Sequence, residues 1–339
     1  MSRLRAEPDF YSFATERIDV MTLCPRTQCT TLASSRNTAC AIRQKSKEDV
    51  MTRRPGTGHS PTLLSRRLAL ELARCREARR LSRDEVTKRL EWSNTTLFRI
   101  ETGRTKPQPR SVRELLDLYG IGGTTKEGLI QLARDARKPG WWHSFRDVLP
   151  NPYEAFIGLE AGASGIRTFE TTMIPGLLQT ADYARAMIRG GPQELDPDEI
   201  ERRVEVRMAR QEILNGADRP RLWTILDEAA LHRTVGGSAI MRRQLVHLAE
   251  MSEQAKTMIQ VVPFAAGAHA GVTGPFVVLD FAEPQDPDVI YLESVPEGVY
   301  LEDADDVGRF ILAFDRLRAA AEHPDESIAL IRKLADAAQ

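Results

Sequence analysis

The chain has 339 residues, of which 42% are hydrophobic and 28% are charged, with a formal net charge of −1. The length is sufficient for two domains, and the composition is typical of a soluble globular protein. No apolar run reaches the roughly 18 residues of a membrane-spanning helix, which excludes a helical membrane protein.

The small net charge hides an uneven distribution. Residues 61–120 contain 14 Lys and Arg against 8 Asp and Glu, whereas residues 151–339 contain 18 against 31. A basic segment (+6) is therefore joined to an acidic one (−13). Basic clustering suggests a phosphate-bearing partner, and a merely solvated face is the alternative.

Cysteine usage points to no metal site. Three of the four cysteines, Cys24, Cys29 and Cys40, lie in the first 50 residues, and Cys75 stands alone in a helical pattern. Cys24 and Cys29 lack the paired Cys or His motif of a zinc site. We expect no metal, no cofactor and a reducing, cytoplasmic environment.

Residues 1–60 are predicted to be a leader that is disordered or not part of the natural protein. Residues 1–50 show no persistent periodicity and no apolar signal-peptide core. Residues 47–49 can be encoded by a purine-rich ribosome-binding sequence just before Met51, so we expect translation to begin there. A genuine disordered tail is the alternative.

Two short helices joined by a tight turn are predicted within residues 81–103. Ser82 followed by Glu85 is a capping box that starts the first helix, and Ser93 can cap the second. The apolar positions of the second helix are three residues apart and face inward. The side chains left on its outer surface are Asn94, Thr95, Phe98 and Arg99.

Further helices surround this pair. One is predicted at residues 63–80, with leucines at helical spacing on one face. Ser111 and Glu114 form a second capping box that would start another helix. We assign residues 61–122 to one helical domain and residues 123–150 to a linker helix and junction.

The segment 81–120 resembles the five-helix DNA-binding domain of lambda-repressor-like, or Xre-like, helix-turn-helix regulators, whose R-I-E-x-G end is intact at residues 99–103. Glu91 departs from the glycine usual at the turn, and Thr87 from a small residue. A non-glycine residue in a left-handed turn costs on the order of 1 kcal/mol. Thr96 and Phe98 replace the Lys and Ser of many relatives, so we expect a different operator or weaker phosphate anchoring.

The resemblance implies double-stranded DNA as the partner. Because Asn pairs with adenine, Arg with guanine and apolar groups with the thymine methyl, Asn94, Thr95 and Phe98 are the base-reading candidates. Arg99 either contacts a phosphate or pairs internally with Glu101 or Glu85. The complete predicted DNA-binding set is Ser82, Arg83, Ser93, Asn94, Thr95, Thr96, Phe98, Arg99, Arg104 and Lys106. A solvated polar surface is the alternative.

Residues 151–339 predict a mixed α+β domain, so the fold class is an all-α helix-turn-helix domain followed by an α+β domain. Helices are expected at residues 152–163, 177–189, 197–215 and 239–254 and in a C-terminal helical stretch. Strands are expected at residues 221–226, 257–263, 275–281 and 289–293. The acidic residues 302–306 can cap the last helical stretch or present charge to a basic partner.

This second part resembles the C-terminal domain of WhiJ-type, Scr-like regulators of sporulating actinobacteria. The matching pieces are residues 139–142, 174–180, 207–211, 227–231 and 261–264. The resemblance implies a transcriptional regulator, often encoded beside a small partner protein and described as antitoxin-like.

Catalysis is the weaker interpretation of this domain. An acid–base cluster would use Asp227, Glu228, His232 and Arg233, joined by His247, His269 or Glu293. Adjacent strand residues point to opposite faces, so Asp227 and Glu228 are not expected to share a proton. The sequence has no nucleophile elbow, HExxH motif or phosphate-binding glycine loop. We expect no catalytic residues and no enzyme.

The sequence therefore predicts a sequence-specific DNA-binding regulator. A homodimer is expected, because one helix-turn-helix unit reads too few base pairs. The C-terminal domain would dimerise, sense a signal or hold a partner. The alternative is an antitoxin-like module that neutralises a small neighbouring gene product and regulates its own operon. A hydrolase or transferase with an accessory DNA-binding domain is a third possibility.

Overall fold

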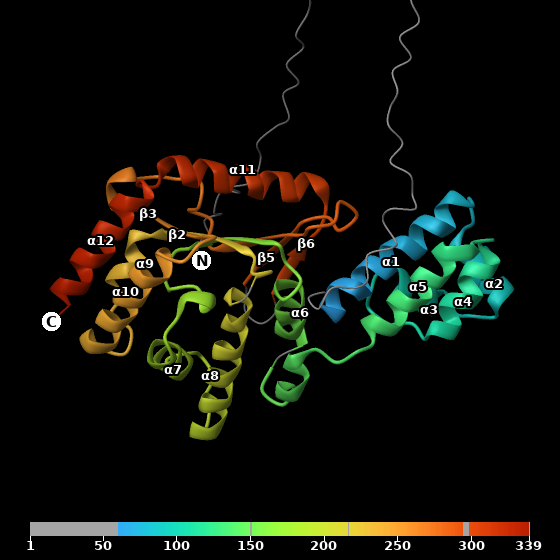
Figure 1. The fold of residues 1–339 in the computed structure, drawn as a ribbon, viewed down its shortest axis with the longest axis horizontal. Coiled ribbons are helices and arrows are strands. Elements are labelled where there is room, and N and C mark those ends of the chain that lie inside the picture. Colours follow the sequence, from blue (N-terminus) through green and yellow to red (C-terminus); the bar gives the residue numbers. More distant parts are fainter. Residues whose placement is uncertain (1–59, 150, 216, 294–297, 339) are drawn as a thin grey trace, which may run out of the picture. The chain divides into compact units, whose positions relative to one another are not determined.

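The computed structural model describes residues 60–149, 151–215, 217–293 and 298–338 (Figure 1). The predicted leader lies outside these residues, apart from Ser60. Ser60 caps the first helix, because its side chain accepts a hydrogen bond from the Thr62 amide at 3.2 Å. None of the described helices is both long and apolar enough to span a membrane.

The first domain consists of five α-helices that enclose one apolar core. The helices are α1 (Pro61–Ala78), α2 (Arg83–Leu90), α3 (Asn94–Glu101), α4 (Pro109–Leu118) and α5 (Gly123–Ala136). Leu68 and Leu72 of α1, Leu97 of α3 and Leu115 of α4 are fully buried in this core. The predicted leucine stripe and the inward position of Leu97 are thereby confirmed.

Two expectations about this domain were wrong. The capping box at Ser111 does not start α4, because the helix begins two residues earlier with Pro109 in its first turn, where the fixed φ of proline fits a helix start. The helix assigned to a linker is α5, and its residues Leu129, Ile130 and Ala133 pack in the same core as α1 and α4.

The second domain contains a six-stranded mixed sheet in the order β3-β2-β1-β4-β5-β6. β1 and β2, and β2 and β3, are parallel, whereas β1 and β4, β4 and β5, and β5 and β6 are antiparallel. The strands are β1 (Gly165–Glu170), β2 (Arg221–Asp227), β3 (Thr257–Val262), β4 (Phe276–Asp280), β5 (Val289–Leu292) and β6 (Val299–Leu301). The all-α then α+β fold class is confirmed, but β1 and β6 were not predicted.

Helices cover both faces of this sheet (Figure 1). They are α6 (Asn151–Glu160), α7 (Ala181–Arg189), α8 (Pro197–Gln211), α9 (Glu228–His232), α10 (Ser238–Ser252), α11 (Ala304–Ala320) and α12 (Pro324–Ala337), with short 3₁₀ helices η1 (Trp141–Phe145), η2 (Gly176–Leu178), η3 (Glu212–Leu214) and η4 (Phe264–Ala266). The predicted C-terminal stretch is thus two helices, and Asp303 caps the first of them, as expected for the acidic segment.

Alternate residues of each strand enter two different cores. Ile166, Leu222 and Val289 belong to the core beneath α6, α7, α10 and α12, whereas Phe169, Ile225 and Ile290 pack against α11. This two-sided burial explains why the strands read as nearly continuous apolar runs. The sheet therefore presents one face to several helices and the other face to α11.

Four aromatic side chains, Trp141, Trp142, Trp223 and Phe264, divide into a buried and an exposed group. Trp142 is buried beside Ile157, and half-buried Trp223 donates from Nε1 to Gln260 at 2.9 Å. Trp141 and Phe264 are 39% and 60% exposed. Phe264 stacks on the ring of His232 at the surface.

Candidate nucleic-acid interface

An open groove lies along α2 and α3 of the helical domain. Five of the predicted DNA-binding residues line it: Ser82, Arg83, Asn94, Thr95 and Phe98. Arg76, Glu77 and Asp84 also line it and were not predicted. No sequence signal distinguishes these three from other charged helix residues, because their position depends on how the helices dock.

The outer face of α3 carries Thr95, Phe98 and Arg99, and Thr95 is adjacent to the other two on the helix because they follow it by three and four residues. All three are exposed, whereas Leu97, Ile100 and Glu101 form the buried face. Within the described part of the chain, the side chains of Thr95 and Arg99 make no hydrogen bond or ion pair. They are therefore available to a partner.

Asn94 is engaged within the domain. Its Nδ2 donates to Oδ1 of Asp84 at 2.6 Å, and its Oδ1 accepts from Oγ1 of Thr87 at 2.7 Å. The hydroxyl of Thr87 thus holds Asn94 in place. Asn94 connects α2 to α3 and must release these bonds before it can pair with a base.

Phe98 lies between two arginines. The guanidinium carbons of Arg83 and Arg104 are 5.4 Å and 5.6 Å from its ring centroid, within the range of a cation–π interaction. Phe98 is 38% exposed, so an edge of the ring remains accessible beside two positive charges. This combination suits an apolar base contact flanked by phosphates.

Glu101, the last residue of α3, holds this helix against α1 and α2 through ion pairs. Its carboxylate accepts from Nε of Arg76 at 2.6 Å and from Nε of Arg83 at 2.7 Å, and its side chain is only 1% exposed. Glu85 accepts from Ser82 in the predicted capping box. The alternative that Arg99 pairs with Glu101 or Glu85 was therefore wrong.

The other predicted DNA-binding residues differ in their exposure and in their contacts. Ser93 caps α3 by accepting from the backbone N–H of Thr96 at 3.1 Å, and the two hydroxyls lie 2.8 Å apart. Arg104 is exposed. Lys106 is half-buried, and burial lowers the pKa of its ammonium group. Its carbonyl accepts from Arg137 of the segment after α5.

The turn between α2 and α3 has the strain expected from its sequence. Glu91 adopts φ 56° and ψ 35°, which is the left-handed conformation that glycine adopts most easily. Its backbone N–H nevertheless donates to the carbonyl of Thr87. The turn is therefore formed, at an energetic cost.

The acid–base candidates of the second domain do not meet at one site. Asp227 caps α9 and lies 3.2 Å from Nε2 of His269, while Glu228 pairs with His232 at 3.2 Å and accepts from the Phe264 amide. His247 lies on α10, where burial lowers its pKa, and Glu293 follows β5. Among the described residues, no group of three or more His, Cys, Asp and Glu is placed to hold a metal ion.

Comparison with known families divides the chain as its two domains suggest. Residues 67–129 match a helix-turn-helix domain, and this match extends into the first half of α5. Residues 153–333 match a domain of unknown function, DUF5753. Searches of curated proteins and of solved structures gave no match. The first match identifies a DNA-binding domain, and the second covers more than half of the chain. The protein is therefore a helix-turn-helix DNA-binding regulator that belongs to the DUF5753 family.

Proposed function

We propose that the protein regulates transcription by reading a specific DNA sequence with α3. The supporting observation is the outer face of α3. The side chains of Thr95 and Arg99 on this face have no partner among the described residues, and Phe98 beside them lies between Arg83 and Arg104. Thr95 and Arg99 read base edges, Phe98 contacts a thymine methyl, and Arg83 and Arg104 bind phosphates. Asn94 positions α3 first and reads a base only after releasing Asp84.

A homodimer supplies the second half-site, because one α3 contacts only a few base pairs. The DUF5753 domain senses a signal that modulates binding and carries out no chemical reaction. A small partner protein encoded nearby is the alternative source of that signal. It would be detected as a stable complex on co-expression.

Fluorescence anisotropy with DNA from the protein's own promoter tests DNA reading. We expect affinity for this DNA to exceed affinity for a scrambled duplex and to fall steeply as salt rises. Arg99→Ala should weaken specific binding by about tenfold or more. Arg134→Ala, which removes the same charge from the exposed side of α5, is the matched control.

Equal affinity for promoter and scrambled DNA would overturn sequence-specific reading. An Arg99→Ala protein that binds the promoter as tightly as the Arg134→Ala control would remove Arg99 from the interface.

A further inference from the structure

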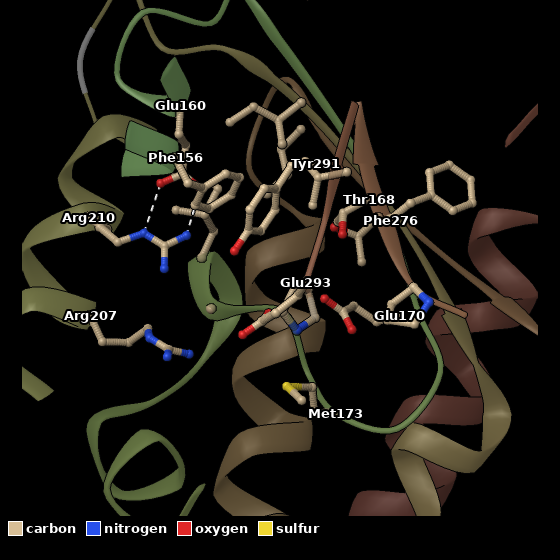
Figure 2. Close-up of a pocket in the computed structure, with 18 of the residues that line it drawn as sticks. Phe156, Glu160, Thr168, Glu170, Met173, Arg207, Arg210, Phe276, Tyr291 and Glu293 are labelled. Carbon is tan, nitrogen blue, oxygen red and sulfur yellow. Dashed lines mark hydrogen bonds and ion pairs between the residues drawn. The ribbon is translucent and has the colours of Figure 1, made fainter. Parts of the chain in front are cut away.

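A cavity lies on one face of the sheet in the DUF5753 domain (Figure 2). Its volume is about 80 Å³, and it is partly open to solvent. Its floor is formed by β1, β2, β4 and β5, and its walls by α6, η2 and α8. The side chains of Ile166, Thr168 and Glu170 reach it from β1, because alternate strand residues share a face. One water molecule needs roughly 10–15 Å³ of such space, so the cavity has room for several water-sized groups of a small ligand.

Two hydroxyls on this floor have no partner. Thr168 and Thr224 are 3% and 0% exposed, and they lie opposite each other in the parallel register of β1 and β2. Neither Oγ1 atom makes a hydrogen bond to the described part of the chain. Buried polar groups are nearly always hydrogen-bonded, so this pair points to a polar atom of a bound molecule.

Two carboxylates face the same space. Glu170 ends β1 and Glu293 follows β5, and Figure 2 shows both carboxyl groups directed into the middle of the cavity. Neither forms a hydrogen bond or ion pair with any residue that the structure describes. Burial, reinforced by the charge of Glu293, raises the pKa of Glu170 to about 8. A cation is the group that would relieve this unfavourable environment.

The arginines of the cavity already have partners. Arg210 donates to both carboxylate oxygens of Glu160, at 2.9 Å and 2.7 Å, in a buried pair. Arg207 donates to Oε1 of Gln179 at 2.9 Å. Because Arg210 and Glu160 neutralise each other, the remaining charged groups of the cavity are the carboxylates of Glu170 and Glu293 and the guanidinium of Arg207. The cavity is therefore net negative when both carboxylates are ionised.

An apolar wall completes the cavity. The rings of Phe156 and Tyr291 stack with centroids 4.2 Å apart, and Ile166 and Leu222 cover the neighbouring floor. These groups would bury the apolar body of a ligand, which contributes most of the affinity of small molecules.

We propose that this cavity binds a small organic amine, with its ammonium group held by Glu170 and Glu293, its polar hydrogens near Thr168 and Thr224, and its apolar body against Phe156 and Tyr291. The amine would be the signal in the proposed sensing role, and only the predicted change in DNA affinity rests on that role. Binding itself does not depend on DNA recognition.

Isothermal titration calorimetry of the full chain with 2-phenylethylamine tests the site. We expect a Kd of about 1 mM or tighter for this minimal probe. The neutral 2-phenylethanol and the anionic 3-phenylpropanoate, which keep the ring, should bind at least tenfold more weakly. Failure of the amine to bind at this level, or tighter binding of the anion, would overturn the proposal.

Substitutions locate the binding. Glu170→Gln should weaken amine binding at least tenfold, and Glu253→Gln, at an exposed carboxylate on the end of α10, should leave it unchanged. Glu293→Gln, at an exposed position, keeps the test valid if the Glu170 variant fails to fold. Unchanged affinity in a folded Glu170→Gln protein, or in Glu293→Gln if the Glu170 variant fails to fold, would contradict the site.

Proton linkage and DNA binding give two further readouts. The amine should displace about one proton from Glu170 at pH 7, so the heat should depend on the buffer's ionisation enthalpy and the affinity should rise up to pH 8. In the anisotropy assay, saturating amine should change promoter affinity. No change, with binding intact, would refute the sensing role and leave the site standing, whereas absent promoter binding would refute only the DNA proposal.

Discussion

The carboxylate of Glu101 is buried in the helix-turn-helix domain, where its side chain is only 1% exposed. Two arginines share it, and one of them, Arg76, is itself buried. Breaking a buried ion pair by removing one partner leaves an uncompensated charge. The pair matters because it joins α1, α2 and α3, which together present the groove.

Glu101→Gln is therefore expected to lower the free energy of unfolding by about 3–5 kcal/mol. Urea denaturation followed by circular dichroism measures the loss. Glu114→Gln, which removes the partner of exposed Arg110, is the control and should change stability by about 0.5 kcal/mol or less. Equal effects of the two substitutions would show that burial of the pair contributes nothing.

At the residue scale, sequence alone predicted residue types better than their partners. Ser82 and Ser93 were placed correctly as helix caps, because capping depends on neighbours in the chain, whereas the capping box predicted at Ser111 was wrong. The bond from Asn94 to Asp84 joins two helices, and the ion pair of Arg76 with Glu101 spans 25 positions. Neither follows from local spacing, because each depends on helix docking.

At the scale of elements, the turn between α2 and α3 holds a non-glycine residue, Glu91, at positive φ. Glu91→Gly should raise the free energy of unfolding by about 0.5–1 kcal/mol, because glycine adopts positive φ without a steric cost. The gain is reduced by the greater freedom of glycine in the unfolded chain. Thermal unfolding of the full chain measures it.

Glu91→Ala provides the comparison, since it removes the charge and keeps the steric cost. A glycine variant that is no more stable than the alanine variant would show that the turn is not strained.

The missed strand β1 shows why part of the fold could not be predicted. Its sequence, GIRTFE, lacks the apolar run seen in β2 and β4 because Thr168 and Glu170 replace apolar residues on one face. That face lines the cavity. The strand departs from the apolar pattern where it contributes to a candidate site, as happens at functional positions in other proteins. β6 has only three residues and is too short to show a period.

At the scale of the whole molecule, Glu170 makes stability depend on pH. Its pKa is about 8 in the folded chain and about 4.3 in an unfolded one, so the folded state holds an extra proton between these values. The resulting stabilisation is complete below pH 4.3 and is lost progressively as the pH rises to 8.

Urea denaturation at pH 5.5 and pH 8.5 tests this dependence. The wild-type protein should lose more unfolding free energy between the two pH values than Glu170→Gln does, because only the wild type must ionise a buried carboxyl group. Parallel losses in both proteins would place the pKa of Glu170 near its ordinary value.

The cavity draws its lining from Tyr153 through Glu293, and one wall comes from the crossover between the parallel strands β1 and β2. During synthesis, all of α1–α5 leaves the ribosome before β5 exists. The helices proposed to read DNA are thus complete on a nascent chain that still lacks part of the proposed amine site. A polypeptide truncated between α5 and β5 would keep the proposed reading helix and lack the proposed effector site.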